Sequence, residues 1–518
     1  MADKIQDIRS ATPAIINRAD VLSNEDPSKK ADLRGGLIRL MYYESILQDT
    51  VRVTLIYADS GDTIEKGGKT VSAAEGLPIV GQERVELVFT DNNENEISFT
   101  KEDDNSLYVN KITPVTDDTT KSLVMLDLVS KEYILNEKIR LNTRFDGKIS
   151  DHVKGILTSM EFDKDGKKVE KKYLDTKKSV ENWEETTGTY SFCGNNNKPF
   201  YTMNWLSKKA VPDKGNPKAL GNSAGYFLWE TSDGFNFRSI DWLMNKDENK
   251  KKKSIIYNDT PAGHCHVPEG YDIKALAAEK DNRVNVQEKL KMGAYSTRTI
   301  MFNPFNCLYE VVTPDAYGKG DVPANQDKLT KAGEKLPVLN DEFNMNKREG
   351  GDGEGIPASS GKKDEKVSDS KEFSRTQFMC IDSGTLIANG SKDPKTWNEG
   401  CKKQLEGSQK EQNFEIKEIL SQSSMRYNQL FSTKISVTIP GEFSLRAGDS
   451  IFFDGPELTG DANKDEIDEK DGGLYIIADL CHYSSSKETY TKINLVRDST
   501  ERKGSPSGGL GCPKSNTI

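Results

Sequence analysis

The chain has 518 residues and a formal charge of −10, from 72 lysines and arginines against 82 aspartates and glutamates. At ~150 residues per domain, this length indicates more than one domain. Hydrophobic residues make up 34% of the chain, which together with glycine is enough to bury a core. The acidic balance argues against a surface that binds nucleic acid or an anionic membrane throughout, because both require an excess of lysine and arginine.

The sequence also bears on the compartment. No apolar run approaches the ~18 residues that cross a bilayer, and the first ten residues carry aspartate and lysine where a signal peptide has its apolar region. We therefore expect no membrane insertion and no secretion by the usual route. The seven cysteines are scattered without a Cys-x-x-Cys pair, so we expect a reducing compartment rather than a disulfide framework.

The first part of the chain changes from an irregular to an alternating pattern. Residues 1–34 show no sustained period and are predicted to form an N-terminal arm. Within residues 35–130, apolar and polar residues alternate, for example Val51, Val53 and Leu55 with Arg52 and Thr54, and Val85 and Leu87 with Arg84 and Glu86. Turn sequences rich in Asp, Asn and Gly separate these runs. The pattern predicts a small antiparallel barrel or sandwich.

Residues 131–224 are predicted to form a mixed α/β region. Ser150-Asp151 stands before Val153, Ile156 and Leu157, which share one helical face, so a helix with an N-cap near Ser150 is expected. Pro199 is predicted to stand near the start of a second helix.

The remainder alternates between regular and irregular parts. Gly225 to Leu243 contains Ser232-Asp233-Gly234 between two aromatic-rich runs, which predicts a hairpin. Residues 262–424 are less regular and include a Gly-, Lys-, Asp- and Ser-rich stretch at 346–372, predicted to be a mobile loop. A helix ending near Leu430 and further strands follow, and 501–518 is predicted to be a peripheral tail.

One sequence looks catalytic. Ile381 to Thr385, with Asp382 in second place, has the hydrophobic-Asp-Ser-Gly-Thr pattern of aspartic proteases, and Asp59-Ser60-Gly61 could be a second copy. Such enzymes need two of these loops so that two carboxylates can share one proton. The second copy ends in Asp62 rather than Thr or Ser, and Asp-Ser-Gly is a common turn sequence, so we favour turns at both places.

Metal, nucleotide and histidine patterns are incomplete. His264-Cys265-His266 has no second ligand pair, Asp461 to Asp465 lacks the glycine that a calcium loop needs, and Gly508 to Ser515 lacks the glycine before the lysine of a phosphate loop. His482 lies in a strand pattern and is expected to be structural. We predict no catalytic, cofactor-binding or metal-binding residue and no cofactor.

Several motifs resemble one family. Leu77 to Glu83, read LPIVGQE, resembles the "LPI-x-G-x-E" strand of the central baseplate hub proteins of contractile-tailed bacteriophages, in particular those of cyanobacterial myoviruses. Further segments are similar to the same family and occur in the family's order: Pro199–Leu206, Gly225–Leu243, Met292–Tyr295, Phe302–Asn303, Ile439–Gly441 and Gly473–Asp498. The family supplies no role for the charged stretches at 346–372 and 463–471.

The resemblance implies a fold that is mainly β with α+β parts: two antiparallel β-barrels like those of tail-tube proteins, plus peripheral α/β domains. The implied divisions are a first barrel at 35–130, a mixed α/β domain at 131–224, a second, discontinuous barrel at 225–261 and 425–500, and an inserted peripheral domain at 262–424.

The resemblance also implies a function. The chain would be a homotrimeric ring in the virion's tail baseplate, assembled in the host cytoplasm, that adapts the sixfold tail tube to the threefold central spike. Its partners would be the tail tube or tube-initiator protein, the spike and neighbouring wedge proteins, while genomic DNA passes through without specific binding. We expect no enzyme activity. The alternatives are a baseplate-associated hydrolase, aspartic-protease-like or wall-degrading, and a receptor-binding or carbohydrate-binding tail protein.

The charge is concentrated in one segment. Residues 35–130 contain 17 acidic and 8 basic residues, a formal charge of −9. If this segment forms part of a ring, its acidic surface is expected to line the channel, where like charge would keep DNA from adhering.

Overall fold

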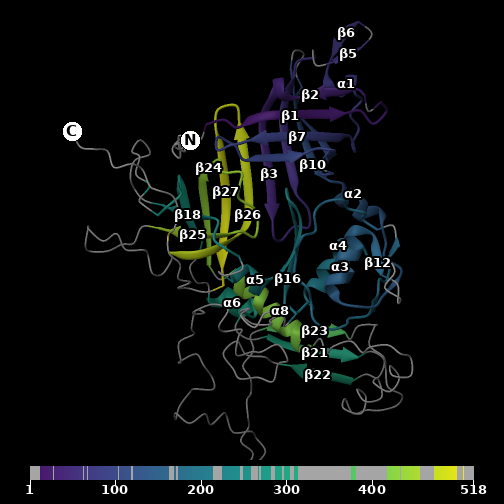
Figure 1. Ribbon diagram of the computed structural model, residues 1–518, viewed down its shortest axis with the longest axis vertical. Helices are drawn as coiled ribbons and strands as arrows, with labels where there is room; N and C mark the ends of the chain where they lie inside the picture. The colour runs from purple at the N-terminus through teal and green to yellow at the C-terminus, as the bar shows by residue number, and fades with distance from the viewer. Residues whose placement is uncertain are drawn as a thin grey trace, which may run out of the picture.

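The structure is a computed structural model. It describes residues 12–312 with short gaps, Arg375–Cys380, residues 417–498 without 432 and 456–471, and Pro506. The chain is mainly β, as the sequence predicts, and its largest sheet has fifteen strands. Among the described residues, the helices lie beside and below this sheet in Figure 1. None of the described helices is long and apolar enough to span a membrane.

The first half of the main sheet comes from the segment predicted to alternate. In sheet order its four central strands, each antiparallel to the next, are β3 (Leu37–Ser45), β4 (Arg52–Asp59), β10 (Ser122–Ser130) and β9 (Leu107–Asp117). The sheet continues from the start of β9 through β7 (Arg84–Thr90), which pairs with β8 (Glu96–Phe99) and with β1 (Ile15–Leu22), and then through β2 (Lys30–Asp32). Small elements complete this half: η1 (Arg34–Gly36), β5 (Ile64–Lys66), β6 (Lys69–Val71) and α1 (Ala73–Gly76).

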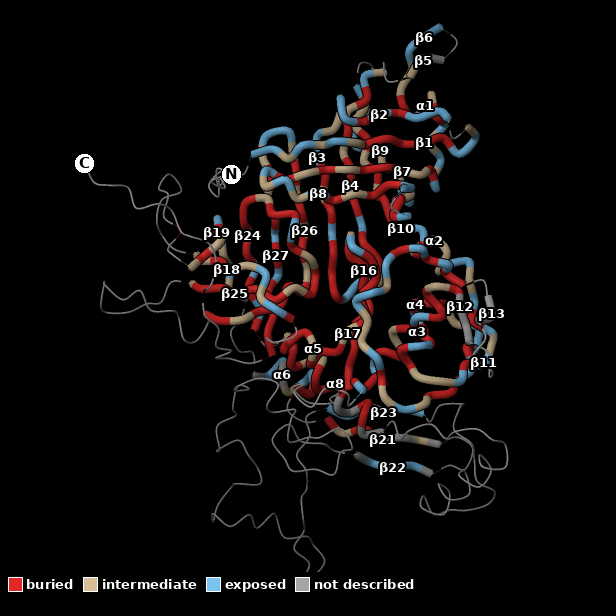
Figure 2. The backbone as a smooth tube through the Cα atoms, in the orientation of Figure 1, coloured by how far each residue is buried: buried red, intermediate tan, exposed pale blue. Residues whose placement is uncertain are grey.

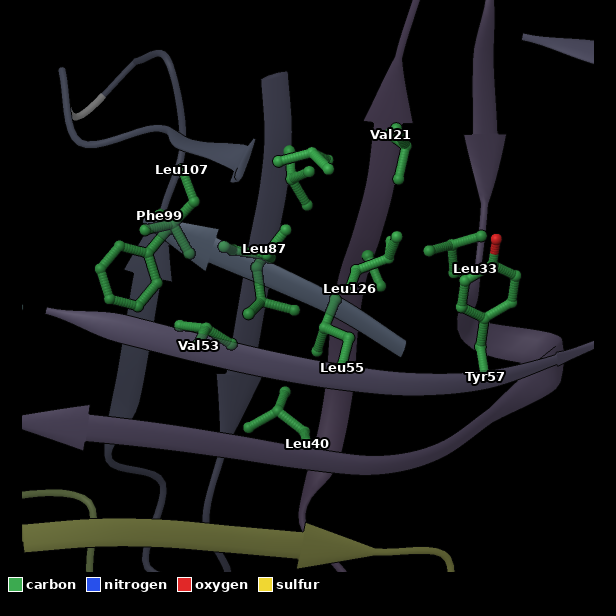
Figure 3. Packing of buried hydrophobic residues seen from close by; sticks show 14 of the residues in the cluster. Val21, Leu33, Leu40, Val53, Leu55, Tyr57, Leu87, Phe99, Leu107 and Leu126 are labelled. Carbon is green, nitrogen blue, oxygen red and sulfur yellow. The ribbon is translucent and has the colours of Figure 1, made fainter. Parts of the chain in front are cut away.

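A hydrophobic core lies between the two parts of this half. β1 and β7 run across the direction of β3 (Figure 1), so the sheet folds over its own inner face. Figure 3 shows Val53 and Leu55 of β4 pointing toward the same interior as Leu87 of β7. Each fully buried side chain of this kind contributes about 2 kcal/mol. The period-two pattern therefore produces a core by placing every second residue inside.

Part of the predicted N-terminal arm is a strand. Ile15–Leu22 pairs with β7 along its length. The arm was expected because residues 1–34 show no sustained period. In the structure, the Asp20 carboxylate is buried and lies 3.0 Å from Arg18 Nε and 2.9 Å from Lys30 Nζ, so these charges are paired within the sheet.

The second half of the main sheet comes from the end of the chain together with a segment from its middle. In sheet order, and again antiparallel, its central strands are β20 (Ala277–Asp281), β24 (Thr433–Pro440), β27 (Thr489–Arg497) and β26 (Gly473–Ser485). β25 (Ser450–Asp454) pairs with the start of β26 and continues through β18 (Lys253–Ile256) to β19 (Ile273–Lys274). A second core, with Ile435, Val437 and Leu495, fills this half.

The two halves have the same topology. In chain order β3, β4, β7, β9 and β10 correspond to β20, β24, β25, β26 and β27, and the sheet order corresponds as well. The correspondence extends to single residues, because a one-residue bulge stands at Asn110 in β9 and at Ala478 in β26. Among the described strands, no ladder closes either half into a barrel, so two closed barrels remain a prediction.

One ladder joins the halves. β26 pairs with β3 from Asp479 opposite Ser45 to Ser485 opposite Arg39. The eight central strands therefore form one continuous antiparallel sheet in the order β20, β24, β27, β26, β3, β4, β10 and β9. The domain limits predicted from the sequence are not tested by this arrangement and remain predictions.

The mixed region contains the predicted helices. Its elements are α2 (Lys131–Lys138), β11 (Arg144–Phe145), α3 (Ile149–Thr158), β12 (Met160–Phe162), β13 (Lys168–Glu170), β14 (Asn182–Trp183), β15 (Phe192–Cys193) and α4 (Pro199–Ser207). Pro199 is in the first turn of α4, as predicted. The N-cap of α3 is Lys148, two residues before the predicted Ser150, which is already inside the helix and buried.

The predicted aromatic hairpin is confirmed. It consists of β16 (Tyr226–Thr231) and β17 (Gly234–Ser239) and leads into α5 (Ile240–Met244). Figure 2 shows that both strands are almost entirely buried. Tyr226 and Phe237 pack into the core of the mixed region, whereas Phe227 and Trp229 pack against the main sheet. The hairpin therefore connects the mixed region to both halves of the sheet.

A small outer layer completes the described chain. It contains α6 (Val286–Met292), α8 (Lys417–Leu430) and a three-stranded sheet of β21 (Thr297–Asn303), β22 (Leu308–Val312) and β23 (Arg375–Cys380). α8 lies between this sheet and the hairpin in Figure 1, and Gln377 donates to the Ser424 hydroxyl over 2.7 Å. The loop predicted at 346–372 lies outside the described residues.

Candidate assembly surface

The eight-stranded sheet has one covered face and one open face. Residues of the covered face, such as Leu55 and Leu495, lie in the two cores. The alternate residues are half-buried or exposed and form what we call the open face. Its central members, in sheet order, are Glu279, Lys434, Ser436, Lys492, Asn494, Asp479, Cys481, Arg39, Tyr43, Arg52, Thr54, Asp127 and Lys111.

The open face carries mixed charge. Its described side chains include five basic residues, Lys434, Lys492, Arg39, Arg52 and Lys111, against three acidic ones, Glu279, Asp479 and Asp127. Only Asp127 of these acids belongs to the segment 35–130. The concentration of negative charge that the sequence shows in that segment is therefore not found on this face.

Some carboxylates of residues 35–130 are turned inward, where they accept backbone N–H groups. Asp59 accepts from Gly61 over 3.1 Å and from Ala73 over 2.7 Å. Asp91 accepts from Asn93 and Asn95 over 2.8 and 2.9 Å, and also from Phe443 of the other half over 2.7 Å. Both aspartates are buried, like Glu44, Glu83 and Glu86. A buried carboxylate that caps backbone donors in this way stabilises the loop around it.

The two outer strands of the eight-stranded sheet have open edges. Beyond Val109, the outer edge of β9 pairs with no other strand among the described residues, and the same holds for the outer edge of β20. An unpaired edge presents a row of backbone donors and acceptors that can pair with another chain. Because eight antiparallel strands alternate in direction, β9 and β20 run in opposite directions and are suited to antiparallel pairing between copies.

A buried polar cluster fixes the junction between the halves. The Glu44 carboxylate of β3 accepts the Tyr42 hydroxyl, the Ser232 N–H over 3.1 Å and the Ala447 N–H over 2.8 Å. Arg446 Nε lies 4.0 Å from Glu44 and 3.1 Å from Asp233. The cluster thus joins the first half, the hairpin turn and the loop before β25.

Burial controls the protonation of this cluster. Burial raises the pKa of Glu44 to about 7, although Arg446 opposes the shift. His482 stacks on Tyr42 with ring centroids 5.9 Å apart, and its Nδ1 lies 2.9 Å from the Thr491 hydroxyl oxygen. Burial, with a contribution from Arg446, lowers the pKa of His482 to about 3, so the imidazole is neutral. His482 is therefore a structural core residue, as expected.

A second buried cluster joins the mixed region to the sheet. Lys178 Nζ lies 3.0 Å from Glu132 of α2 and also pairs with Glu230 of β16, and all three side chains are at most 3% exposed. Glu230 further accepts the Ser130 hydroxyl and the Val51 N–H. Burial alone would lower the pKa of Lys178, but the two carboxylates raise it to about 12, so the lysine is charged.

The LPIVGQE motif has a physical explanation. The fully buried Glu83 carboxylate accepts the N–H groups of Val80 and Gly81 over 2.8 Å each and the Asn24 amide over 3.1 Å. Gly81 has φ +115, which favours glycine. The result is a rigid loop that holds Val80 80% exposed at its tip. The motif is thus a structural cap that leaves one apolar side chain exposed.

The other sequence candidates divide into two groups. Asp59, from the second Asp-Ser-Gly copy, caps a turn, as the turn interpretation predicted. Asp382 and its loop, His264 to His266, Asp461 to Asp465, and Gly508 to Ser515 lie outside the described residues. Within the described part of the chain, no group of three or more His, Cys, Asp or Glu side chains is arranged to hold a metal.

Sequence reasoning missed the two open edges and the strand order that the two halves share. Strand order is set by contacts between segments far apart in the chain, and alternation within one strand does not reveal it. The only local signal was Pro114 in β9, since proline within a strand is typical of an edge.

Comparison with solved structures identifies several similar folds. The chain superposes on the 43 kDa tail protein of prophage MuSo2 from Shewanella oneidensis with a TM-score of 0.42 and 10% identity, over 94% of this chain and 100% of that one. It superposes on a tail protein from Neisseria meningitidis MC58 with a TM-score of 0.42 and 8% identity, over 93% of this chain and 96% of that one. The chain is similar to phage tail proteins. It also superposes on an E. coli component of the type VI secretion system with a TM-score of 0.37 and 6% identity, over 95% of this chain and 79% of that one.

No family model and no curated protein matches the sequence.

Proposed function

We propose that this chain is the structural hub of a phage tail baseplate, a homotrimeric ring that adapts a sixfold tail tube to a threefold spike. The observation that carries the proposal is the eight-stranded sheet, built from two topologically equivalent halves with an open edge at each end. Three copies joined edge to edge supply six equivalent halves. Such a ring has threefold symmetry by chain and approximate sixfold symmetry by sheet, which an adapter requires.

The ladder within the chain predicts the ladder between chains. β26, after its bulge, pairs with β3, the first strand of the other half. By correspondence, β9 after its bulge pairs with β20 of the next copy. In the observed ladder, Cys481 of β26 lies opposite Tyr43 of β3. Thr113 of β9 is the position equivalent to Cys481, and Asp281 of β20 is the position equivalent to Tyr43. We therefore expect Thr113 of one copy opposite Asp281 of the next.

In this ring the open face lines the channel through which DNA passes. The acidic lining expected from the sequence is replaced in the proposal by a wall of mixed charge, because Asp127 is the only acid of 35–130 among the central residues named for the open face. Opposite charges side by side still give a wall without a strong field, which suits a DNA that slides without specific binding. The tail tube, the spike and wedge proteins are the partners proposed for the rims and outer surface.

The test is the oligomeric state combined with directed cross-linking. Light scattering of the full-length protein is expected to give three times the chain mass, and a stable monomer would refute the ring. The double variant Thr113→Cys/Asp281→Cys places two cysteines opposite each other across the proposed ladder. Facing positions in antiparallel strands have Cα atoms about 4.5–5.5 Å apart, which is within the range of a disulfide. Oxidation should give covalent dimers and trimers.

A register control accompanies this experiment. In Thr113→Cys/Lys280→Cys, the second cysteine would point to the opposite face, because successive side chains alternate across a strand. No covalent trimer is expected from this pair. Equal cross-linking of both pairs would contradict the proposed ladder even if the protein were trimeric.

The chain is proposed to act mechanically, without enzyme activity and without a cofactor. The protease alternative needs two catalytic aspartates, and Asp59, one of the two candidates, already serves two backbone donors. Unchanged infectivity of particles that carry Asp382→Asn is the expected result. A loss of infectivity with normal particle assembly would revive the hydrolase alternative.

A further inference from the structure

We infer that the LPIVGQE loop docks on a second copy of this chain, with Val80 of one copy buried against the end of β20 in the next. The inference rests on the proposed ring and adds to it a contact outside the paired strands. Exposure of Val80 is not sufficient evidence, because single exposed apolar side chains are normal on protein surfaces. The evidence is a second loop of the same kind, which is already docked inside the chain.

The LPIVGQE loop is tied to β9 at the point where the outer edge of that strand becomes open. Gln82, with φ +68, donates its N–H to the Val109 carbonyl over 2.7 Å, and the Val109 N–H donates to the Glu83 carbonyl over 2.9 Å. The Glu83 carboxylate accepts the N–H of Val80, three residues earlier, over 2.8 Å. The bulge of β9 at Asn110 follows directly. The loop therefore stands where the open edge begins.

The loop before β25 is tied to β26 in the same way. Gly448, with φ +91, donates its N–H to the Ile477 carbonyl over 2.8 Å, and the Ile477 N–H donates to the Asp449 carbonyl over 2.9 Å. The Asp449 carboxylate accepts the N–H of Arg446, again three residues earlier, over 2.9 Å. The bulge of β26 follows directly here as well. Arg446 is therefore the counterpart of Val80.

The loop before β25 is docked on the first half of the sheet. The Ala447 N–H donates across the junction to the Glu44 carboxylate of β3 over 2.8 Å. The Arg446 side chain lies in the same junction, with Nε 4.0 Å from Glu44 and 3.1 Å from Asp233, and it is only 15% exposed. β3 is also the strand that pairs with β26. The loop thus reinforces the ladder between β26 and β3 from outside the paired strands.

The surface that corresponds to β3 is supplied to the LPIVGQE loop by another copy. In the proposed ring, β9 pairs with β20 of the next copy as β26 pairs with β3, so the loop beside β9 faces the end of that β20. Val80 is 80% exposed in the single chain, whereas its docked counterpart Arg446 is 15% exposed. Burial of Val80 between copies would stabilise the ring in proportion to the apolar area removed from water.

The two loops differ in the chemistry of the contact. Gly81, the counterpart of Ala447, donates its N–H to the Glu83 carboxylate of its own loop over 2.8 Å, so this donor is satisfied before any copy docks. Val80 presents an apolar side chain where Arg446 presents a guanidinium. The contact between copies is therefore apolar, and it excludes a charge at position 80, because an unpaired buried charge is unfavourable. The loop is already ordered by Glu83, so little entropy is lost on docking.

The experiment compares Val80→Asp with Val80→Leu in the full-length protein by sedimentation velocity over a dilution series. Val80→Asp is expected to raise at least about tenfold the concentration at which half of the chains are trimeric, whereas Val80→Leu should leave it unchanged. Tyr201→Asp, at a position of α4 that is 61% exposed, is the control for an added charge and should behave like the wild type. Far-ultraviolet circular dichroism verifies that all three variants fold.

Cysteine labelling gives a second readout that does not depend on dissociation of the trimer. Val80→Cys and Tyr201→Cys are treated with a maleimide, and modification is measured by mass spectrometry of the peptide that carries each position, so the native cysteines do not interfere. In the trimer, position 80 is expected to react several-fold more slowly than position 201, although both side chains are largely exposed in the single chain.

The outcomes separate this inference from the proposed ring. A trimer that forms the Thr113→Cys/Asp281→Cys cross-link but labels position 80 as fast as position 201 would overturn the docking loop and leave the ring intact. An equal change in affinity for Val80→Asp and Tyr201→Asp, or no change for either, would overturn the docking loop in the same way. A wild-type protein that is monomeric and forms no cross-link would overturn both.

Discussion

Lys178 offers a direct test of how the mixed region is attached to the sheet. Lys178→Met keeps the length and apolar volume of the side chain but removes the only cation bonded to both Glu132 and Glu230 in this cluster of described residues. Removing one partner of a buried ion pair costs about 3–5 kcal/mol, because an uncompensated charge remains in the interior. At about 2–4 °C per kcal/mol, the melting temperature is expected to fall by about 10 °C.

The pH dependence gives this prediction a second readout. In the wild type, burial raises the pKa of Glu132, but Lys178 outweighs burial and holds that pKa below its usual value. In the variant this attraction is absent, so burial raises the pKa of both carboxyls above their unfolded values. Folding then takes up protons, and the stability of the variant decreases as pH rises. The gap in melting temperature between the two proteins should shrink from about pH 8 to about pH 5.

Lys177 provides the matched control. Its side chain is 59% exposed and lies 3.0 Å from Asp175, which is also largely exposed. Lys177→Met is expected to cost at most about 1 kcal/mol at every pH, since exposed pairs contribute little. Thermal scans that place Lys178→Met within about 2 °C of Lys177→Met, or a gap that does not change with pH, would refute the reasoning.

Three further predictions concern other buried groups. Glu83→Ala should lower the free energy of unfolding, measured by denaturant titration, by about 2–4 kcal/mol, because the N–H groups of Val80 and Gly81 lose their charged acceptor. Burial raises the pKa of Glu44 to about 7, so protonated Glu44 contributes its full stabilisation of the folded state below the unfolded pKa. This stabilisation is lost as pH rises through 7. The melting temperature should therefore fall over this range in the wild type but not in Glu44→Gln. Gly448→Ala should lower the free energy of unfolding by about 2 kcal/mol, through backbone strain and a contact with the Trp229 ring. The changed packing of Trp229 should be visible in near-ultraviolet circular dichroism. Gly35→Ala, which has open space around it, should change neither measurement.

The sequence predicted the local structure well where one signal dominated. Val53 and Leu55 alternate with Arg52 and Thr54 at the start of β4, and both are buried. The aromatic hairpin was found because Ser232-Asp233-Gly234 is a strong turn signal between apolar runs. β1 was missed because Arg18 and Asp20 are paired inside the sheet, and a pattern of residue types does not show which charges are paired.

The candidate assembly surface was predicted only in outline. The resemblance implied two related β units, but which strands carry the open edges follows from long-range pairing such as Asp479 with Ser45. The charge of 35–130 was counted correctly, and its place on a channel wall stays a prediction. A count treats every carboxylate as solvent-exposed, whereas Asp59, Glu83 and Asp91 are more valuable inside, where each accepts two or more backbone N–H groups.

The repeated topology has a consequence for how such a protein can vary. In a ring of six identical subunits, any substitution or insertion appears at all six positions. Here two equivalent units belong to one chain, so each can change alone. The connection between β3 and β4 is the six residues 46–51, whereas the equivalent connection between β20 and β24 is the 151 residues 282–432. In the proposed ring, alternate positions can therefore hold different partners while the inner sheet stays uniform.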